Sequence, residues 1–324
     1  MNIVIMGATS HIAKGLIERL LARGDEHLYL FSRSEESVQN FLGNIGQRER
    51  CNYSICGDYQ AFKSFSYDVI INCIGVETRN KHNCDFTRYF SVTEEFDNLA
   101  ISYLRERNRN ALYISFSSGA VYGKGFSEPV NDDAVNALHI NHIAQEDYYS
   151  IARINAEAKH RAHGDLNIVD LRIFSYFSRH INLNDGYFIT DVIQALLNNE
   201  VLITDDNNIV RDYLHPDDLL AMILCCVEAG RLNRAFDVNS SRPASKQDIL
   251  DHFTREYGLR YEIRQILKTS PATGAKTNYY STNRDASQIG YHPRFSSLGT
   301  LEDQARPLLS SIIHRKKELI NAHE

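Results

Sequence analysis

The chain has 324 residues, of which 43% are hydrophobic, and it carries a formal net charge of −6 at pH 7. This length and composition allow a full buried core, in one large domain or in two unequal lobes. The sequence has no long basic run, so we expect no nucleic-acid partner.

The sequence also gives no reason to expect a membrane protein. No stretch contains the roughly 18 apolar residues that a bilayer-spanning helix needs. The first residues lack a basic leader, and Ser10, His11 and Lys14 interrupt their apolar run, so we expect the chain to begin inside its fold. The six cysteines, at positions 51, 56, 73, 84, 225 and 226, form no CxxC pair and fit free thiols in the cytoplasm. His, Cys and Asp residues show no metal-ligand spacing, so no metal is expected.

Hydrophobic runs of strand length alternate with helical periodicity through the first half of the chain. This pattern is typical of βαβ units around a parallel sheet. Right-handed crossovers then predict an α/β fold with a Rossmann-type, doubly wound sheet, whose ligand crevice lies at the carboxyl ends of the strands. The expected strands are 2–6, 27–31, 51–56, 68–74, 111–116 and 167–173, and the expected helices are 12–23, 92–105 and 145–160.

The rhythm changes after residue 173, which indicates a smaller, mostly C-terminal α/β lobe. A helix at 190–198 and a strand near 201 are expected there, followed by a helix at 217–229 and a strand at 235–239 that return to the sheet. Helices at 246–257 and 301–320 follow. The expected division is a Rossmann domain of residues 1–176, to which 211–240 return, and a substrate lobe of residues 177–210 and 241–324.

The turn after the first expected strand has the features of a phosphate-binding site. Its backbone N–H groups and the helix that follows it can bind the pyrophosphate of a dinucleotide. Ser10 and Ala13 stand where this motif usually has its second and third glycines, and both are small but less free in φ. An ordinary polar turn after a buried strand is the alternative. The residues expected to contact the cofactor here are Gly7, Thr9, Ser10, His11 and Ile12.

The second expected strand leads into Ser32 and Arg33, where an NAD site normally carries an acid for the ribose hydroxyls. A guanidinium at this point can bind a 2′-phosphate, which an acid would repel. We therefore expect NADP(H), with NAD(H) as the second choice, and a solvated surface arginine as the alternative. Further cofactor contacts are expected at Asp58 and along the backbone of Cys73, Ile74 and Gly75.

Three residues form the expected catalytic constellation. Ser118 ends a strand in a cluster of hydroxyl groups, and Tyr149 and Arg153 lie four residues apart on an expected helix. This spacing puts the phenol and the guanidinium on one helix face, where a fixed cation favours the phenolate and can hold a ribose. Tyr149 can then act as a general acid or base. Alternatively, Tyr149 packs as an ordinary aromatic residue and Ser118 only forms a turn.

The chain resembles extended short-chain dehydrogenases/reductases, the family of nucleotide-sugar epimerases, dehydratases and reductases, over nearly its whole length. The resemblance implies substrate contacts at Ser118, Gly119 and Arg211, the last with the substrate diphosphate, and cofactor contacts at Tyr149 and Arg153. It also implies a homodimer formed through the helices at 92–105 and 145–160. The segments that carry the resemblance are the turn at Gly7, Ser-Ser118-Gly-Ala-Val-Tyr122-Gly123, the Tyr149 helix, Leu171-Arg172, Arg211-Asp212-Tyr213-Leu-His-Pro-Asp217-Asp218 and Asp285-Ala-Ser-Gln-Ile-Gly290-Tyr-His-Pro293.

Two departures from the family pattern matter. The usual active-site Lys, four residues after the Tyr, is Arg153 here. Arginine keeps the charge and can donate to the nicotinamide ribose, but it does not readily release a proton. Together with the altered turn at Gly7, this leaves open a non-catalytic NADP-binding sensor. Arg172 and Arg211 have a structural alternative, as salt-bridge partners of Asp212 or Asp217.

The residues beside Ser118 narrow the expected chemistry. A 4,6-dehydratase of this family needs a carboxylic acid and a carboxylate next to the catalytic hydroxyl, and the corresponding positions are Gly119 and Ala120. A C4 epimerase retains its NAD, whereas a reductase exchanges NADPH, and Arg33 favours the reductase. We therefore expect NADPH-dependent reduction of a 4-keto or 3-keto deoxysugar nucleotide, as in polysaccharide biosynthesis. Tyr149 would donate the proton, Ser118 would bond the developing alkoxide, and Arg153 would bind ribose. An NAD-dependent nucleotide-sugar epimerase is the runner-up.

Overall fold

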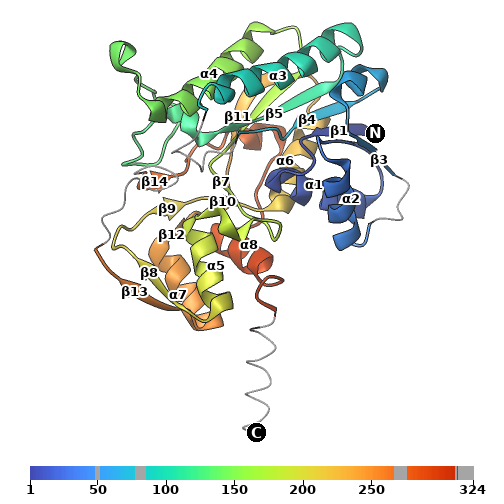
Figure 1. Ribbon diagram of the computed structural model, residues 1–324. Coiled ribbons are helices and arrows are strands. Elements are labelled where there is room, and N and C mark those ends of the chain that lie inside the picture. Colours follow the sequence, from blue (N-terminus) through green and yellow to red (C-terminus); the bar gives the residue numbers. More distant parts are fainter. Residues whose placement is uncertain (48–51, 77–84, 266–275, 311, 313–324) are drawn as a thin grey trace.

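A seven-stranded sheet lies at the centre of the computed structural model, which describes all residues except 48–51, 77–84, 266–275, 311 and 313–324. Its strand order is β11-β6-β5-β4-β1-β2-β3, and every neighbouring pair is parallel (Figure 1). The chain winds outward from β1 in both directions, which confirms the doubly wound Rossmann-type fold. The strands are β1 (Asn2–Met6), β2 (His27–Phe31), β3 (Tyr53–Cys56), β4 (Val69–Asn72), β5 (Leu112–Ser118), β6 (Ile168–Ile173) and β11 (Asn233–Val238).

Helices cover both faces of this sheet (Figure 1). On β1, Ile3 and Ile5 pack into the core on one face of the sheet, whereas Val4 and Met6 pack into the core on the other face. Successive strand residues face opposite sides, so a strand covered on both faces is continuously apolar. One face carries α1 (His11–Arg23), α2 (Glu35–Asn44) and α6 (Pro216–Glu228), and the other carries α3 (Arg88–Glu106) and α4 (Gln145–Ala162).

A second core lies in the smaller lobe, below the sheet in Figure 1. It is built by α5 (Phe188–Asn198), α7 (Lys246–Tyr257) and α8 (Ser297–Ala305). Short strands accompany these helices: β8 (Val201–Thr204) pairs with β13 (Arg260–Ile263), β7 (Ser175–Tyr176) pairs with β10 (Tyr213–Leu214), and β9 (Val210–Arg211) lies between β12 (Ala244–Ser245) and β14 (Asn278–Tyr279). The short 3₁₀ helices are η1 (Tyr59–Ser64), η2 (Gly119–Tyr122), η3 (Ile140–His142), η4 (Leu183–Asp185) and η5 (Asp285–Ile289).

The expected bounds of the sheet strands agree with the observed bounds to within a few residues. The helix expected at 301–320 is wrong in extent, because α8 runs from Ser297 to Ala305 and the chain turns at 306–309; most of the remainder lies outside the described residues. Helix α2 and most of the lobe's short strands were not expected. The division into residues 1–176 with 211–240, and 177–210 with 241–324, stays a prediction.

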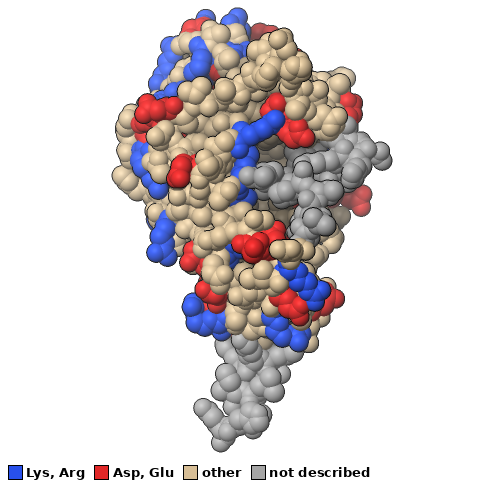
Figure 2. All heavy atoms as spheres, turned by 90° about the vertical axis from the view of Figure 1, so that its left-hand side faces the viewer, with Lys and Arg blue, Asp and Glu red and all other residues tan. Residues whose placement is uncertain are grey.

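The surface in Figure 2 carries Lys, Arg, Asp and Glu side chains of both signs side by side among the described residues. In that same part of the chain, no helix combines the length and the apolar character needed to cross a membrane. Cys56, Cys73, Cys225 and Cys226 are free thiols, and Cys51 and Cys84 lie outside the described residues.

Candidate active site

The turn after β1 brings the expected phosphate-binding residues together. The N–H groups of Gly7 and Ala8 both donate to the Phe31 carbonyl at 2.9 Å, which ties the turn to the end of β2. Ser10 begins α1 as its N-cap, its hydroxyl accepting from the Ala13 N–H at 3.3 Å. Gly7 has φ +76°, and a Cβ there would lie 2.9 Å from Ile74 Cγ1. Only glycine fits both the backbone conformation and the close approach.

The other residues of the turn lie around α1. Thr9 and Ser32 hydroxyls are 3.5 Å apart, the His11 ring meets the Tyr176 ring edge-on at a centroid distance of 4.9 Å, and Ile12 packs against the core. Gly7 and Thr9 therefore lie at the end of β2, and Ser10, His11 and Ile12 form the start of α1.

Tyr59, on η1, is a site residue that the sequence analysis missed. Its hydroxyl accepts from the Gly7 N–H at 3.1 Å and donates to the Phe31 carbonyl at 3.3 Å. Burial raises the pKa of Tyr59 to about 12, so the phenol keeps its proton. No sequence signal beyond an aromatic residue next to Asp58 marks this role.

One cation and two carboxylates lie around the end of β2. Arg33 is exposed, and Asp58 is exposed and begins η1 by accepting from the Gln60 N–H at 2.8 Å. Glu35 approaches the backbone after β3, since a Cβ added at Gly57 would lie 2.6 Å from Glu35 Oε1. Arg33 is thus accessible to a ligand, as expected. The carboxylate of Glu35, which was not expected, lies in the same region.

The end of β4 lies between the turn at Gly7 and the helix that carries Tyr149. The Cys73 N–H donates to the Met6 carbonyl at 2.9 Å, and the Ile74 N–H donates to Asn72 Oδ1 at 3.0 Å. Burial raises the pKa of the Cys73 thiol, so it stays protonated. A Cβ added at Gly75 would lie 3.9 Å from Arg153 Nη2, which places the guanidinium beside the expected path of the cofactor.

Tyr149 and Arg153 interact as their spacing on α4 predicts. The Arg153 guanidinium carbon lies 5.2 Å from the centre of the Tyr149 ring, and Arg153 Nη1 donates to the Phe116 carbonyl at 3.2 Å. Burial alone would lower the pKa of Arg153, but a hydrogen bond and charge interaction with Tyr149 outweigh it and raise that pKa. The guanidinium therefore connects β5, the phenol and Gly75.

Ser118, at the end of β5, lies in the same region but is bonded to a different phenol. Its Oγ is 3.1 Å from the hydroxyl of Tyr279, and it accepts from the Ala120 N–H at 3.2 Å. Tyr279 is buried. Burial is the main cause that raises the pKa of Tyr279, and the charge of Tyr149 raises it further. Ser118 and Tyr279 are therefore in contact, and Tyr149 lies close enough to influence the charge of Tyr279.

Two basic side chains from the smaller lobe approach Tyr279. Arg211 is buried, and its Nη1 donates to the carbonyls of Val210 and Lys276, each at 2.9 Å. Its guanidinium carbon lies 5.9 Å from the centre of the Tyr279 ring, and Lys276 Nζ lies 4.2 Å from that centre. Burial, together with the charge of Arg211, lowers the pKa of Lys276 to about 8.

Gly119 is enclosed by Phe174. A Cβ at position 119 would lie 2.4 Å from Phe174 Cδ1, closer than real Cβ atoms approach other heavy atoms. The backbone beside Ser118 therefore has no room for a side chain.

Arg172 is part of a polar network beneath the site. Its Nη2 donates to Glu157 Oε2 at 2.6 Å and its Nη1 to the Tyr122 hydroxyl at 2.8 Å, while Ser117 donates to Glu157 Oε1 at 2.6 Å. Asp237 accepts from Tyr122 at 2.9 Å. The alternative partners considered from the sequence were wrong for Arg172, since Asp217 pairs with Arg19 at 2.7 Å and Asp212 accepts from the Ser240 N–H at 2.9 Å.

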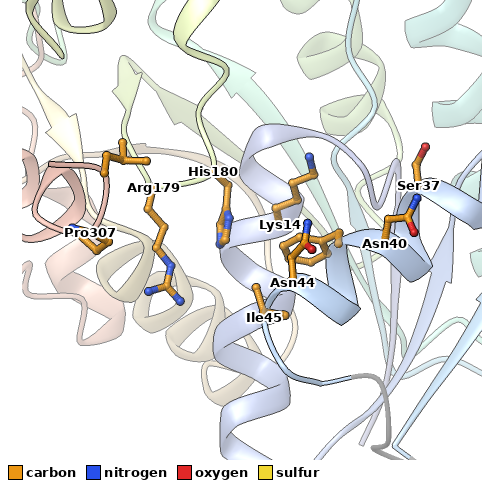
Figure 3. Close-up of a pocket in the computed structure, with 10 residues that line it drawn as sticks. Lys14, Ser37, Asn40, Asn44, Ile45, Arg179, His180 and Pro307 are labelled. Carbon is orange, nitrogen blue, oxygen red and sulfur yellow. The ribbon is translucent and has the colours of Figure 1, made fainter. Parts of the chain in front are cut away.

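A cavity of about 620 Å³ lies elsewhere, between α1, α2 and the smaller lobe. Figure 3 shows Lys14 and Asn40 on the helices facing Arg179, His180 and Pro307. None of the expected site residues lines this cavity. Among the described residues, no group of three or more His, Cys, Asp or Glu side chains could hold a metal ion.

Residues 3–239 match the model of the NAD dependent epimerase/dehydratase family, and the chain belongs to this family. No curated protein sequence matches it.

Solved structures of low sequence identity share the fold. The UDP-glucuronic acid 4-epimerase of Bacillus cereus, solved with UDP-glucuronic acid and NAD, is 17% identical, with a TM-score of 0.76 over 94% of this chain and 98% of that one. The UDP-N-acetylglucosamine 4-epimerase of Methanobrevibacter ruminantium M1 is 16% identical, with a TM-score of 0.77 over 96% and 98% of the two chains. A dTDP-glucose 4,6-dehydratase of Bacillus anthracis, solved with NAD, is 15% identical, with a TM-score of 0.72 over 94% and 96%.

Proposed function

We propose that this protein is an NADP(H)-dependent oxidoreductase that reduces a keto group, at C4 or C3, on the sugar of a nucleotide-linked deoxysugar. The observation that carries the proposal is the position of Arg153, whose guanidinium lies over the ring of Tyr149 and beside Gly75 at the end of β4. An acid–base phenol is thereby held next to the backbone along which a dinucleotide would run. Ser118 is hydrogen-bonded to Tyr279, whose charge is influenced by Tyr149.

The residues present fit a dinucleotide. The turn at Gly7 and the N-terminus of α1 would hold its pyrophosphate, and the exposed Arg33 would pair with a 2′-phosphate. The nicotinamide ribose would lie between Gly75 and the pair Tyr149 and Arg153. When bound, NADPH supplies the hydride.

The protein's own groups bind the substrate and move the proton. Tyr149 donates a proton to the keto oxygen, Arg153 restrains the phenol, and Ser118 donates a hydrogen bond to the developing alkoxide. Arg211 and Lys276 provide positive charge for a diphosphate at the side of the smaller lobe.

Two features bear on the choice among the chemistries of the family. Gly119 has no room for the carboxyl group that dehydration needs beside the catalytic hydroxyl, because Phe174 occupies that space. Arg33 at the end of β2 favours NADPH, the cofactor that a net reductase exchanges at each turnover.

Epimerisation with tightly held NAD is the second candidate. Glu35 supports it, because its carboxylate beside Gly57 can accept hydrogen bonds from ribose hydroxyls. The family match and the NAD in the Bacillus cereus epimerase structure support it further. A cytoplasmic homodimer formed through α3 and α4, which pack side by side on one face of the sheet (Figure 1), belongs to the same proposal.

The proposal is tested by mixing the purified protein with dTDP- and UDP-linked 4-keto-6-deoxyglucose and following nicotinamide absorbance with NADPH or NADH. We expect stoichiometric NADPH oxidation, with kcat/KM at least about tenfold higher for NADPH than for NADH, which corresponds to one charge-assisted contact of about 1.4 kcal/mol. Interconversion of UDP-sugar epimers without net absorbance change would instead identify an epimerase. Cofactor binding without either reaction would identify a sensor.

A further inference from the structure

We propose that Tyr279 is a positioning residue that holds Ser118 as a hydrogen-bond donor to the substrate oxygen. The inference rests on the proposed function, and it adds a residue from the smaller lobe to the reaction site. Tyr279 Oη lies 3.1 Å from Ser118 Oγ, although the two residues are 161 positions apart in the sequence.

The direction of this hydrogen bond follows from the partners of the two hydroxyls. A tyrosine hydroxyl has one hydrogen to donate, and burial keeps the Tyr279 phenol protonated. Among the described residues, Ser118 Oγ is the hydrogen-bond partner of this hydroxyl, and no other acceptor is bonded to it. The phenol hydrogen therefore points at Ser118 Oγ.

The direction of this hydrogen bond determines which group the Ser118 hydroxyl can itself donate to. A serine hydroxyl accepts through two lone pairs and donates through one hydrogen. Its two acceptor positions are filled by the Tyr279 hydroxyl at 3.1 Å and the Ala120 N–H at 3.2 Å. The remaining hydrogen is free to point at the substrate oxygen, and a donor that accepts two hydrogen bonds is polarised by them. Ser118 is thereby a donor suited to an oxygen that gains negative charge.

The surroundings of Tyr279 hold its hydroxyl in place. Its ring meets Phe126 and Phe174 edge-on, at centroid distances of 4.8 and 5.3 Å. Its strand, β14, pairs with β9, where Tyr279 lies opposite Arg211. Arg211 also bonds the carbonyl of Lys276 just before that strand. The phenol is therefore fixed by packing and by backbone pairing, and its hydroxyl is left for Ser118.

The test is a double-mutant cycle on NADPH oxidation with UDP-4-keto-6-deoxyglucose, using Tyr279→Phe, Ser118→Ala and the double variant. Tyr279→Phe keeps the ring and removes only the hydroxyl. We expect it to lower kcat about tenfold, the loss of one orienting hydrogen bond, while KM changes less than twofold. In the Ser118→Ala background the same substitution should change kcat less than twofold. Tyr280→Phe, which removes the hydroxyl of the next residue, is the matched control and should keep the wild-type rate.

Equal factors in the two backgrounds, or a wild-type rate in Tyr279→Phe, would overturn the inference. A wild type that turns over no keto-sugar nucleotide would instead refute the proposed function. In that event the urea midpoints of the same four proteins test the pairing itself: a midpoint shift from Tyr279→Phe that disappears in the Ser118→Ala background supports it, and an equal shift in both backgrounds contradicts it.

Discussion

Gly7 shows how one residue connects the fold to the site. It joins β1 to α1 in a left-handed conformation, and its α-carbon faces the backbone of Cys73 and the side chain of Ile74 at the end of β4. Two of the segments expected to bind the cofactor are therefore in contact, with no space for a methyl group between them.

Gly7→Ala is expected to destabilise the protein and weaken NADPH binding. The φ of +76° costs a non-glycine residue about 1–2 kcal/mol, and the 2.9 Å contact with Ile74 adds to that cost. The matched control is Gly46→Ala, at φ +69° with no atom within 4 Å of the added Cβ, which should carry the backbone cost alone. Urea unfolding and a NADPH fluorescence titration measure the two effects. Equal destabilisation in both variants would show that the approach of β4 to Gly7 is unimportant.

The sequence predicts local site features far better than distant ones. Gly7, Ser10 and the pair Tyr149 and Arg153 could be proposed as site residues because turn chemistry and helical spacing act over a few residues. Tyr279 carried no such signal, since only the folded lobe brings it to Ser118.

At the scale of elements, α4 carries both the proposed proton donor and a residue of a buried ionic network. Tyr149 and Arg153 lie toward its N-terminal end, and His160 lies near its C-terminal end, fully buried. His160 Nε2 is 2.6 Å from Asp97 Oδ1 and its Nδ1 is 2.8 Å from Asp170 Oδ1. Both ring nitrogens face carboxylates, so both donate, and the imidazole is protonated.

The stability of the protein should fall as pH rises through about 9. Burial opposes the charged form, but the hydrogen bonds and charges of Asp170 and Asp97 outweigh it and raise the pKa of His160 to about 9. Because the folded-state pKa lies above the unfolded value, this contribution is fully present below about pH 6.5 and is lost as pH rises through 9. Its size is on the order of 3 kcal/mol.

Urea unfolding between pH 6 and pH 9.5 checks this expectation. His160→Gln should be less stable than the wild type at pH 6, because it removes the buried cation that Asp97 and Asp170 share, and its stability should depend less on pH. Parallel pH profiles of the two proteins would show that His160 is not the titrating group.

Elements with strong periodicity could be predicted, and short ones could not. Helix α7 was expected with its observed bounds. In the structure, a capping box of Ser245 and Asp248 begins it, and Gly258 ends it in a left-handed conformation. Helix α2 has only Val38, Phe41 and Leu42 as buried residues, too few to stand out in its polar sequence. The two-residue strands β9 and β14 form only because distant backbones pair.

At the scale of the whole molecule, the site is assembled from both cores. Ser118, Tyr149 and Arg153 come from the sheet and its covering helix, whereas Arg211 and Tyr279 come from the strands of the smaller lobe. The fold class followed from the alternation of strands and helices, but the arrangement of the lobe's short strands depends on long-range contacts that no local pattern encodes.

The most direct measurement is stopped-flow oxidation of NADPH by a keto-sugar nucleotide in the wild type, in Tyr149→Phe and in Tyr148→Phe. Tyr148 precedes Tyr149 on α4 and packs against Phe86 and Phe90, so its substitution removes a neighbouring hydroxyl away from the site. With Tyr149 as the proton donor, Tyr149→Phe should slow hydride transfer at least about a hundredfold with unchanged NADPH affinity, and Tyr148→Phe should keep the wild-type rate. An unchanged rate in Tyr149→Phe would contradict the account.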